Sequence, residues 1–343
     1  MIAACLGATA CASAPADRWE ALDSSTMICL EGGSFAMGDV FSEGAKDELP
    51  VHEVTVSAFC LGEAEITVGQ FARFVAEAGF RTSAEAPADQ AAKDSIVALA
   101  LTPGLSREER LALASELLSF GGCARWDADQ RRFGDYEPLT WAAAGFEQDD
   151  SHPAVCLSWD DAASYANWVS GLEGLPPAYR VSTGDLLDTD GHPTTDIASV
   201  GGYRLPTEAE WEFAAREGGR AVRFGNGKDL ADPAEAAFDA SVGDWTYQVR
   251  GPLRRGTSPV RSYLPNALGF HDLAGNAWEW ISDFLARYPQ GSAVDPYQSE
   301  GFGRAVRGGR WGGDAFELRA AKRFQWQSNN RCTASGFRLA RSR

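Results

Sequence analysis

The stretch RAVRGGRWGGDAFELRAAKRF, residues 304–324, decides the fold of this chain together with three further stretches of the same character. These are GGYRLPTEAEWEFAAR at residues 201–216, NALGFHDLAGNAWEW at residues 266–280 and MICLEGGSFAMG at residues 27–38. Each combines glycines, which permit tight turns, with aromatic side chains large enough to fix the loops between the turns. The chain has 36 glycines and 11 tryptophans among 343 residues, which favours a loop-rich fold pinned by aromatic residues over a helical bundle.

Taken together, the four stretches resemble the formylglycine-generating enzymes, also called sulfatase-modifying factors. The resemblance covers residues 27–343 apart from two insertions, at residues 86–120 and 181–200. It implies an α+β fold similar to that of C-type lectins, with little regular secondary structure for its length. The first insertion is rich in Ala and Leu and predicts a helix at residues 107–118. The second predicts a loop or a loose hairpin.

The same resemblance implies a catalytic centre that this chain lacks. Members of the family oxidise a substrate cysteine with a copper ion held by two cysteines that follow an Arg-Gly-Gly turn. Here the turn at residues 307–309 is followed by Gly313 and Leu318 at the matching positions. A soft Cu(I) ion requires thiolates, which neither residue supplies, and Cys332 is a single thiol further on. We therefore expect no copper and no formylglycine-generating activity, and whether the chain is another kind of enzyme stays open.

The resemblance also implies a calcium site in the stretch that ends in GNAWEW. The positions that match the family's ligands are Asp272, Gly275, Ala277 and Glu279. Two carboxylates and two backbone carbonyl groups are ligands that calcium prefers, so we expect one calcium ion here. The alternative is that Asp272 and Glu279 cap the turn and pair with a nearby arginine. A second family site is not expected, because Ala237 replaces its asparagine ligand.

Residues 310–335 form the C-terminal surface through which we expect a ligand or a protein partner to bind. In the family this segment lies around the active-site surface, and its aromatic side chains stand beside amides, which suits sugars, peptides and flat ligands. The predicted ligand-binding residues are Trp311, Gly313, Asp314, Phe316, Phe324, Gln325, Trp326, Gln327, Asn329 and Asn330. The alternative for Trp311 and Trp326 is a place in the core.

The end of this segment is also similar to the variable tail of proteins that retroelements diversify. Those proteins share the fold and end in Arg-x-x-x-x-Gly-Phe-Arg, which here occupies residues 331–338. Six residues have codons reachable from asparagine by changes of adenine: Gly312, Gly313, Asp314, Thr333, Ala334 and Ser335. A variable protein of a diversity-generating retroelement is therefore one hypothesis for the function.

Local patterns predict several elements. Four hydroxyl residues each precede a Gln or an acid by three positions, which marks a helix start: Thr67 with Gln70, Ser106 with Glu109, Ser158 with Asp161, and Thr207 with Glu210. Alternation at residues 52–59 predicts a half-buried strand, and residues 27–37 predict a strand that enters a turn. In the helix after Thr207, Trp211 and Phe213 are expected in the core. Residues 226–265 predict a loop.

Residues 1–26 are expected to be the remnant of an export leader and a linker. The stretch is apolar and rich in small residues, and Cys11 follows Ala-Thr-Ala as a permissive lipidation signal. The alternatives are peptidase cleavage at residues 12–14 and a plain Ala-rich tail. The predicted location is outside the cytoplasm, in the periplasm or at the cell surface, with Cys11 as the lipid-bearing residue.

The remaining cysteines agree with an oxidising compartment. Cys29 with Cys60 and Cys123 with Cys156 are candidate bridges, although the sequence alone leaves their connectivity open. Cys332 is left over. No C-x-x-C motif occurs, so a zinc site is not expected.

No catalytic residue is predicted. The chain lacks the G-x-S-x-G, G-x-x-x-x-G-K and G-x-G-x-x-G motifs of hydrolases and nucleotide-binding proteins. A related class of sulfoxide synthases binds iron with three histidines, mostly in a separate helical domain that is not visible here. The four histidines are therefore expected to be structural: His52, His152, His192 and His271.

The charge of the chain limits its partners. At pH 7 the formal net charge is −17, and an acidic surface repels the phosphate backbone of nucleic acids. No run of about 20 apolar residues is present, so no segment is expected to cross a membrane. We expect a protein or a small molecule as partner, with membrane contact only through a lipid anchor.

These observations predict an exported, non-copper protein similar to formylglycine-generating enzymes that binds a ligand or partner through its C-terminal surface. A diversified variable protein is one form of this prediction. The first alternative is a periplasmic modifying enzyme with different chemistry on the same scaffold, for example in siderophore maturation. The second is a structural lipoprotein of the cell envelope.

Overall fold

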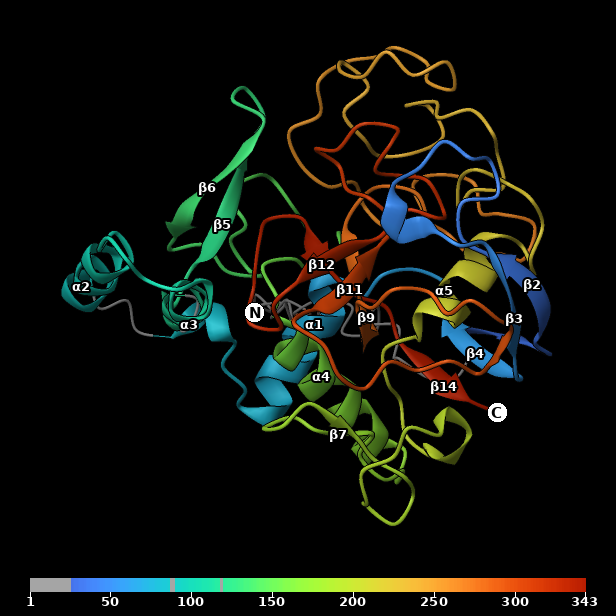
Figure 1. The fold of residues 1–343 in the computed structure, drawn as a ribbon, viewed down its shortest axis with the longest axis horizontal. Coiled ribbons are helices and arrows are strands. Elements are labelled where there is room, and N and C mark those ends of the chain that lie inside the picture. The colour runs from blue at the N-terminus through green and yellow to red at the C-terminus, as the bar shows by residue number, and fades with distance from the viewer. Residues whose placement is uncertain (1–25, 87–89, 118–119) are drawn as a thin grey trace, which may run out of the picture.

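A computed structural model describes residues 26–86, 90–117 and 120–343 of the chain. At its centre lies a four-stranded sheet in the order β12-β11-β9-β13 (Figure 1). The strands are β9 (Trp278–Phe284), β11 (Arg304–Arg307), β12 (Phe324–Trp326) and β13 (Ser335–Gly336). Strand β11 runs antiparallel to both β9 and β12, whereas β13 runs parallel to β9. The last quarter of the sequence thus supplies the centre of the fold.

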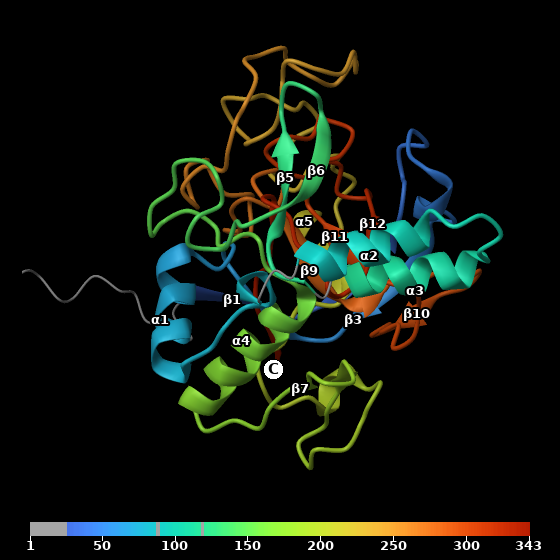
Figure 2. The same cartoon turned by 90° about the vertical axis from the view of Figure 1, so that its left-hand side faces the viewer.

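The central sheet separates two hydrophobic cores, because successive side chains of a strand point to opposite faces. Trp280 and Val306 face the first core, whereas their neighbours Ile281 and Ala305 face the second. Two helices contribute to the first core and lie together, and one helix contributes to the second (Figures 1 and 2). They are α1 (Val68–Ala78) and α4 (Trp159–Leu172) in the first core and α5 (Glu208–Ala215) in the second.

Two three-stranded sheets cover the second core. One has the order β1-β4-β14, with β1 at Met27–Leu30, β4 at Phe59–Gly62 and β14 at Ala340–Ser342. The other has the order β10-β3-β2, with β2 at Gly33–Met37, β3 at His52–Val56 and β10 at Ala293–Val294. The first and last described strands therefore lie in the same sheet.

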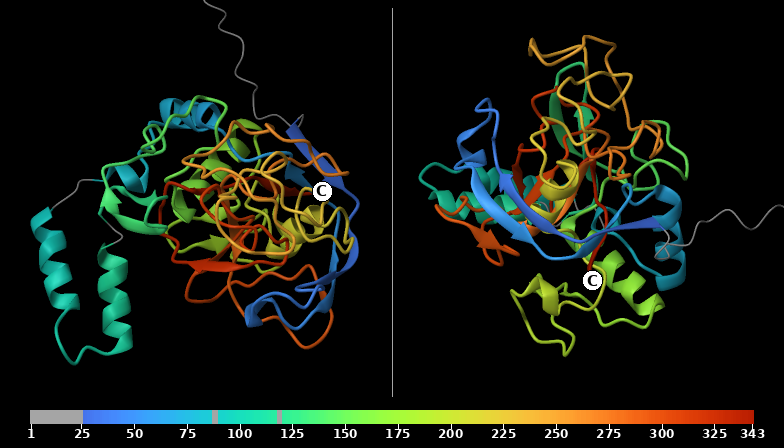
Figure 3. Two further views of the ribbon diagram at one scale, coloured as in Figure 1. Left: turned by 90° about the horizontal axis from the view of Figure 1, so that it is seen from above. Right: turned by 90° about the vertical axis from the view of Figure 1, so that its right-hand side faces the viewer.

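Three hairpins lie around this body. They are β5 (Cys123–Asp127) with β6 (Arg132–Glu137), β7 (Tyr179–Arg180) with β8 (Asp185–Leu186), and the helical pair α2 (Gln90–Ala100) and α3 (Arg107–Leu117). The helical pair stands away from the rest of the molecule (Figure 3). It is the predicted helical insertion, and the second insertion contains β8 and the short 3-10 helix Ile197–Ser199 within loops. Among the described residues, no helix is long and apolar enough to span a membrane.

All four predicted helix starts are confirmed. At α5, Glu210 N donates to Thr207 Oγ1 at 3.1 Å and Thr207 N donates to Glu210 Oε2 at 2.8 Å. The same reciprocal bonds occur at the starts of α1, α3 and α4. Trp211 is fully buried and Phe213 is 4% exposed, as expected for core residues.

Both predicted N-terminal strands are wrong in extent, since each is divided in two. Residues 27–37 form β1 and β2, with a break at Gly32, whose φ of +77° is not favourable for other residues. Residues 52–59 enter both β3 and β4, and the break follows Ser57, whose N and Oγ donate to the carboxylate of Asp295. The periodicity could not reveal this bond, because 238 residues separate its partners. The loop at 226–265 contains no helix or strand, as expected.

Two disulfides join the candidate pairs. Cys29–Cys60 links β1 to β4, and Cys123–Cys156 links the start of β5 to the loop before α4. Cys332 is a free, buried thiol. The second bridge fixes the base of the β5–β6 hairpin against the body of the protein.

Candidate functional site

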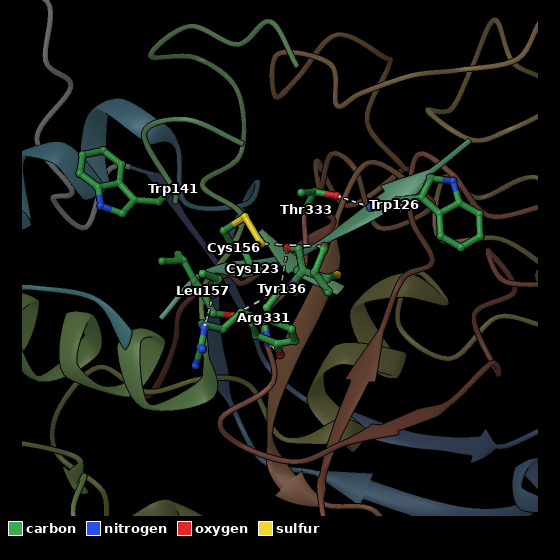
Figure 4. Close-up of a disulfide and its surroundings, with 12 residues drawn as sticks. Cys123, Trp126, Tyr136, Trp141, Cys156, Leu157, Arg331 and Thr333 are labelled. Atoms are coloured by element: carbon green, nitrogen blue, oxygen red, sulfur yellow. Dashed lines mark hydrogen bonds between the residues drawn. A yellow bond between two sulfur atoms is a disulfide. The ribbon is translucent and has the colours of Figure 1, made fainter. Parts of the chain in front are cut away.

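The β5–β6 hairpin forms one wall of the candidate site, and the C-terminal segment runs beside it. Ala124 N donates to Arg331 O, Thr333 N donates to Ala124 O, and Trp126 N donates to Thr333 Oγ1, all at 3.0 Å. Figure 4 shows the bridge between Cys123 and Cys156 at the base of the hairpin, with Thr333 beside Trp126. Backbone bonds and a disulfide therefore hold this wall in place.

A cavity of about 500 Å³ lies between the hairpin and the body. This volume falls within the range of small-molecule sites. Four segments line the cavity: the hairpin, the loop after it, the loop at residues 226–265 and the C-terminal segment. The lining residues are Arg125, Trp126, Asp127, Ala128, Asp129, Gly134, Glu137, Gly145, Phe146, Arg255, Trp311 and Thr333. We call it the hairpin cavity.

Beside the hairpin cavity lies the guanidinium group of Arg310, which is only 4% exposed. It stacks over Trp126 at 3.6 Å from the ring centroid and lies 4.7 Å from that of Trp278. Its charge is paired with Glu317, whose Oε1 accepts a 3.3 Å hydrogen bond from Nη2 and whose Oε2 lies 3.2 Å from Nε. Aromatic faces and one carboxylate thus fix the arginine within the protein.

Burial shifts the pKa values of this ion pair in opposite directions. It lowers the pKa of Arg310 and raises the pKa of Glu317, and the nearby charge of Asp314 raises the pKa of Glu317 further. The ion pair opposes both shifts. A carboxyl group with a raised pKa can exchange a proton more readily near neutral pH than an exposed glutamate.

Two glycines make room for these side chains. A Cβ atom at Gly312 would collide with the Nε1 of Trp126 and lie 2.8 Å from Arg310 Nη1. A Cβ atom at Gly313 would collide with Glu317 Oε2 and lie 2.7 Å from its Cδ. Gly313 is one of the positions at which the family resemblance places a copper-binding cysteine. The other, Leu318, is fully buried in an apolar cluster. The Glu317 side chain fills the space beside Gly313, and Leu318 packs in an apolar cluster, so neither position presents a thiolate.

A row of aromatic side chains continues from the hairpin over the central sheet. Phe133 on β6 lies 5.0 Å from Trp126 and 6.2 Å from Trp326, between ring centroids. Phe324 and Trp326 lie 5.1 and 4.6 Å from Trp278. We call these five residues the aromatic row. Phe324 and Trp326 are half-buried against the first core, and Gln325 between them is exposed, as expected for successive side chains of a strand.

The predicted ligand-binding residues do not all lie on one accessible surface. Trp311 is 2% exposed and donates its Nε1 to Thr333 O, which agrees with the alternative of a place in the core, and Gly313 is also buried. Trp311 nevertheless lines the hairpin cavity. Of the other predicted residues, Gln325 is exposed. The remaining seven are half-buried: Asp314, Phe316, Phe324, Trp326, Gln327, Asn329 and Asn330. The sequence left Trp311 between the surface and the core, because nothing local distinguishes a buried indole from an exposed one.

A second aromatic group holds Asp314 and Phe316. The rings of Trp245 and Phe316 stack at 5.0 Å, and Trp245 Nε1 donates to Asp314 Oδ2 at 2.9 Å. Lys322 joins this group to the aromatic row, because its Nζ lies 5.3 Å from the Phe316 ring and 4.5 Å from that of Phe324. The C-terminal segment therefore contributes to two neighbouring groups, the aromatic row and the group around Trp245, rather than to one flat surface.

The positions predicted for calcium surround a buried ion pair. Glu279 accepts bonds from Arg338 at 2.6 and 2.7 Å and from Trp211 Nε1 at 2.9 Å, while Asp272 Oδ2 accepts from Arg261 N at 2.8 Å. Among the residues that the structure describes, no three His, Cys, Asp or Glu side chains come together to hold a metal ion. In this arrangement, Asp272 caps the turn and Glu279 pairs with Arg338, which is the alternative to a cation site given above.

The charge balance still leaves calcium as a prediction. Glu65 is buried beside the same turn, and its oxygens accept bonds from Asn276 Nδ2 and Ala277 N. Burial, with the charges of Asp272 and Glu279, raises the pKa of Glu65 well above its ordinary value. Glu65, Asp272 and Glu279 all interact electrostatically with Arg338, and carboxylate oxygens such as these are ligands that calcium would bind in their ionised form.

The histidines are separate from the site. His52 Nδ1 contacts Pro50 O, His271 Nδ1 contacts Tyr263 O, and His152 Nδ1 contacts Asp149 Oδ1. Each therefore has a local partner, in keeping with the structural role expected from the sequence. His192 is an exposed loop residue near Asp188.

The residues that sequence reasoning missed are Trp126, Phe133, Arg310 and Glu317. The hairpin that carries Trp126 and Phe133 lies directly after the insertion and has no motif of its own. A signal for Arg310 was present, since a large cation directly follows Gly308-Gly309 and precedes two further glycines. Only the folded chain shows that one of those glycines, Gly312, lies against its guanidinium group.

Comparisons with known proteins now place the chain. Residues 13–343 match the family model described as a sulfatase-modifying factor enzyme 1-like domain. The formylglycine-generating enzyme of Streptomyces coelicolor is 31% identical over 290 residues, which cover 83% of this chain and 78% of that protein. The chain therefore belongs to the sulfatase-modifying factor family.

Two solved structures show the same fold. PvdO from Pseudomonas aeruginosa matches with a TM-score of 0.58 and 24% identity, covering 92% of this chain and 93% of that one. Treponema denticola variable protein 1 matches with a TM-score of 0.56 and 21% identity, covering 92% and 95%. The α+β fold that the sequence resemblance implied is confirmed.

Proposed function

We propose that this protein is a non-copper member of the family that binds a small molecule or an extended segment of a partner in the hairpin cavity. The observation that carries the proposal is the cavity of about 500 Å³ lined by Trp126 and Trp311, in a chain that has Gly313 and Leu318 at the family's two thiolate positions. Arg310 and the aromatic row supply a charged donor and flat apolar faces beside it. Such a combination is typical of ligand sites.

A cavity-blocking variant tests the proposal. Gly134 lines the hairpin cavity, and a Cβ atom there would lie 3.8 Å from its nearest neighbour, so Gly134→Leu obstructs the cavity without a clash at Cβ. Gly291→Leu is the matched control, because Gly291 is exposed, has nothing within 4 Å of its Cβ position and does not line the cavity.

The measurement is a thermal-shift screen of peptides, sugars and small carboxylic acids. We expect compounds that raise the melting temperature of the wild type to do so in Gly291→Leu and to lose the effect in Gly134→Leu. Compounds that stabilise Gly134→Leu as strongly as the wild type would place binding elsewhere.

A second candidate, an enzyme with different chemistry, is favoured by one observation. Glu317 is half-buried and pairs with Arg310 beside the cavity, and its raised pKa suits proton transfer to or from a ligand. Once a ligand is known, Glu317→Gln separates the two candidates. A binding protein retains its function in this variant, whereas an enzyme that uses Glu317 retains binding and loses turnover.

We further propose that the protein is exported. The two disulfides support this location, because such bridges persist in oxidising compartments. Cys11, the expected lipidation residue, lies outside the described residues. Mass spectrometry of the membrane fraction tests the anchor, and recovery of an unmodified Cys11 contradicts it.

The hypothesis of a diversified variable tail has less support. Five of the six positions with suitable codons are buried, namely Gly312, Gly313, Thr333, Ala334 and Ser335, and only Asp314 is half-exposed. Diversification alters contacts with partners only where side chains are accessible. Deep sequencing of this gene in a population of cells tests the hypothesis directly.

A further inference from the structure

The hairpin cavity has five charged side chains in its lining, and three of them are engaged within the protein. Arg255 Nη1 and Nη2 donate to the two carboxylate oxygens of Asp129 at 3.1 and 2.7 Å. Asp127 Oδ1 accepts two bonds of 2.9 Å from backbone N atoms of the hairpin turn, which it closes. The two charged groups that are left are those of Arg125 and Glu137.

Arg125 and Glu137 lie side by side without a hydrogen bond between them. Arg125 Nη1 and Glu137 Oε2 are 3.8 Å apart, which is longer than a hydrogen bond. Among the residues that the structure describes, neither charged group has a hydrogen-bonded partner. Their side chains are 52% and 44% exposed, so a molecule in the cavity can reach both. An exposed ion pair of this kind adds little stability, and a ligand can therefore take the place of either partner.

The hairpin holds these two groups in position. Arg125 belongs to β5 and Glu137 to β6, and the strand pairing places Glu137 opposite Cys123. Because Cys123 is bonded to Cys156, the end of the hairpin that carries both charges is attached to the body of the protein. Groups that are already in position lose little conformational freedom when a ligand binds. The pair is therefore a preformed anchor for a ligand.

A cation and an anion side by side are complementary to a ligand that carries both charges close together. A guanidinium group binds a carboxylate through two parallel hydrogen bonds, and a carboxylate binds an ammonium group. An α-amino acid has its carboxylate and its ammonium group on the same carbon atom. The half-buried rings of Trp126 and Phe146 line the same cavity and offer apolar faces to a side chain.

We propose that the hairpin cavity binds an α-amino acid with an apolar side chain, whose carboxylate is bound by Arg125 and whose ammonium group is bound by Glu137. This inference rests on the proposed function, because it names the class of molecule that the cavity recognises. The two charged residues determine the specificity for the amino-acid group, and the rings of Trp126 and Phe146 accommodate the side chain.

The test compares four compounds that differ in the charges they carry. Phenylalanine has both charges, N-acetylphenylalanine has only the carboxylate, phenylalaninamide has only the ammonium group, and N-acetylphenylalaninamide has neither. Dissociation constants are measured at about pH 6, where α-amino groups are protonated and carboxyl groups are ionised. The reporter is the amide resonance of Gly145 in the ¹⁵N-labelled full chain, because Gly145 lines the cavity next to Arg125. The amide of Gly291, which is exposed and outside the cavity lining, is the control resonance.

We expect phenylalanine to bind about tenfold more tightly than either singly charged compound, because each of these lacks one charge-assisted hydrogen bond. Arg125→Gln should remove the advantage of phenylalanine over phenylalaninamide, and Glu137→Gln its advantage over N-acetylphenylalanine. Arg180→Gln is the matched control, since Arg180 is exposed and pairs with Asp185 outside the cavity lining. This variant should leave all four dissociation constants unchanged.

Three results would overturn the inference. The first is that none of the four compounds moves the Gly145 resonance of the wild type. The second is that a singly charged compound binds as tightly as phenylalanine. The third is that Arg125→Gln and Glu137→Gln keep the full preference of the wild type for phenylalanine. Both side chains are about half exposed, so these variants are expected to fold.

Failure of this inference is distinguishable from failure of the proposed function. Compounds of the screen that stabilise the wild type and Gly291→Leu but not Gly134→Leu keep the cavity as the site, even where no phenylalanine compound binds. A preference for phenylalanine that depends on Arg125 and Glu137 but persists in Gly134→Leu keeps the charged pair and removes the proposed ligand cavity.

Discussion

At the scale of single residues, charge pairing inside the protein has the largest consequences. Arg338 is fully buried and donates to both oxygens of Glu279 and to the carbonyl groups of Gly62 and His271. Removing one partner of such a pair leaves a charge in the interior without compensation. We expect Arg338→Met to lower the free energy of unfolding by about 3–5 kcal/mol in urea denaturation. Addition of Glu279→Gln should recover part of the loss, because it removes the charge and keeps an acceptor for Trp211. If Arg338→Met lowers the free energy of unfolding by less than about 1 kcal/mol, the ion pair between Arg338 and Glu279 is not formed in solution.

The same group of residues decides whether calcium binds. Burial raises the pKa values of Glu65 and Asp272, and a calcium ion bound here would stabilise their ionised form. We expect EDTA to lower the melting temperature and added calcium to restore it. A site filled at 100 times its dissociation constant adds about 2.7 kcal/mol to the stability. If the melting temperature is the same with EDTA and with excess calcium, the ion pair alone organises this turn.

At the scale of elements, the junction between β9 and α5 contains a titratable group. Asp283, near the end of β9, accepts bonds from Glu208 N at the start of α5 and from Gln298 N. Burial, together with the charge of Glu208, raises the pKa of Asp283 to about 7. An unfolded aspartate titrates at about 3.9, so between these values the folded state holds a proton that the unfolded state has lost. The contribution of Asp283 to stability is therefore full below about pH 4 and is lost as the pH rises through about 7.

Asp283→Asn tests this junction. We expect the variant to show a smaller fall in the free energy of unfolding between pH 4 and pH 7 than the wild type. Asp135→Asn, at an exposed position of β6, is the control and should leave the pH profile unchanged. An identical profile in Asp283→Asn and the wild type would mean that Asp283 is ionised and solvated in the folded state.

The same scale shows what the sequence could predict. Helix starts depend on residues three positions apart, so the reciprocal bonds of Thr207 and Glu210 were readable from the sequence alone. The division of the strand at residues 52–59 depends on Asp295, and the site depends on a hairpin that packs against the C-terminal segment. Those contacts join distant parts of the chain. The long sequence motifs predicted the fold. Patterns around single residues left the burial of Trp311 open and missed Trp126.

At the scale of the whole molecule, buried ion pairs connect segments that secondary structure does not join. Arg319 pairs with Glu48 and Arg323 with Glu208, over 271 and 115 residues of sequence. Among the described residues, six strands have only two residues or belong to isolated two-stranded hairpins, so such connections, with the aromatic cores, hold the loops in one arrangement. The family scaffold is therefore retained in full although the two thiolate positions have other residues.

The central claim is that this scaffold has no copper chemistry and instead presents a binding site. The most direct test is titration of the purified full chain with Cu(I), followed by incubation with a sulfatase-type cysteine peptide under oxygen. Gly313 and Leu318 supply no thiolate, and the Cys332 thiol is buried with its pKa raised to about 12. We predict no tight copper binding and an unoxidised peptide. Stoichiometric copper binding with conversion of the peptide cysteine to formylglycine would contradict the account.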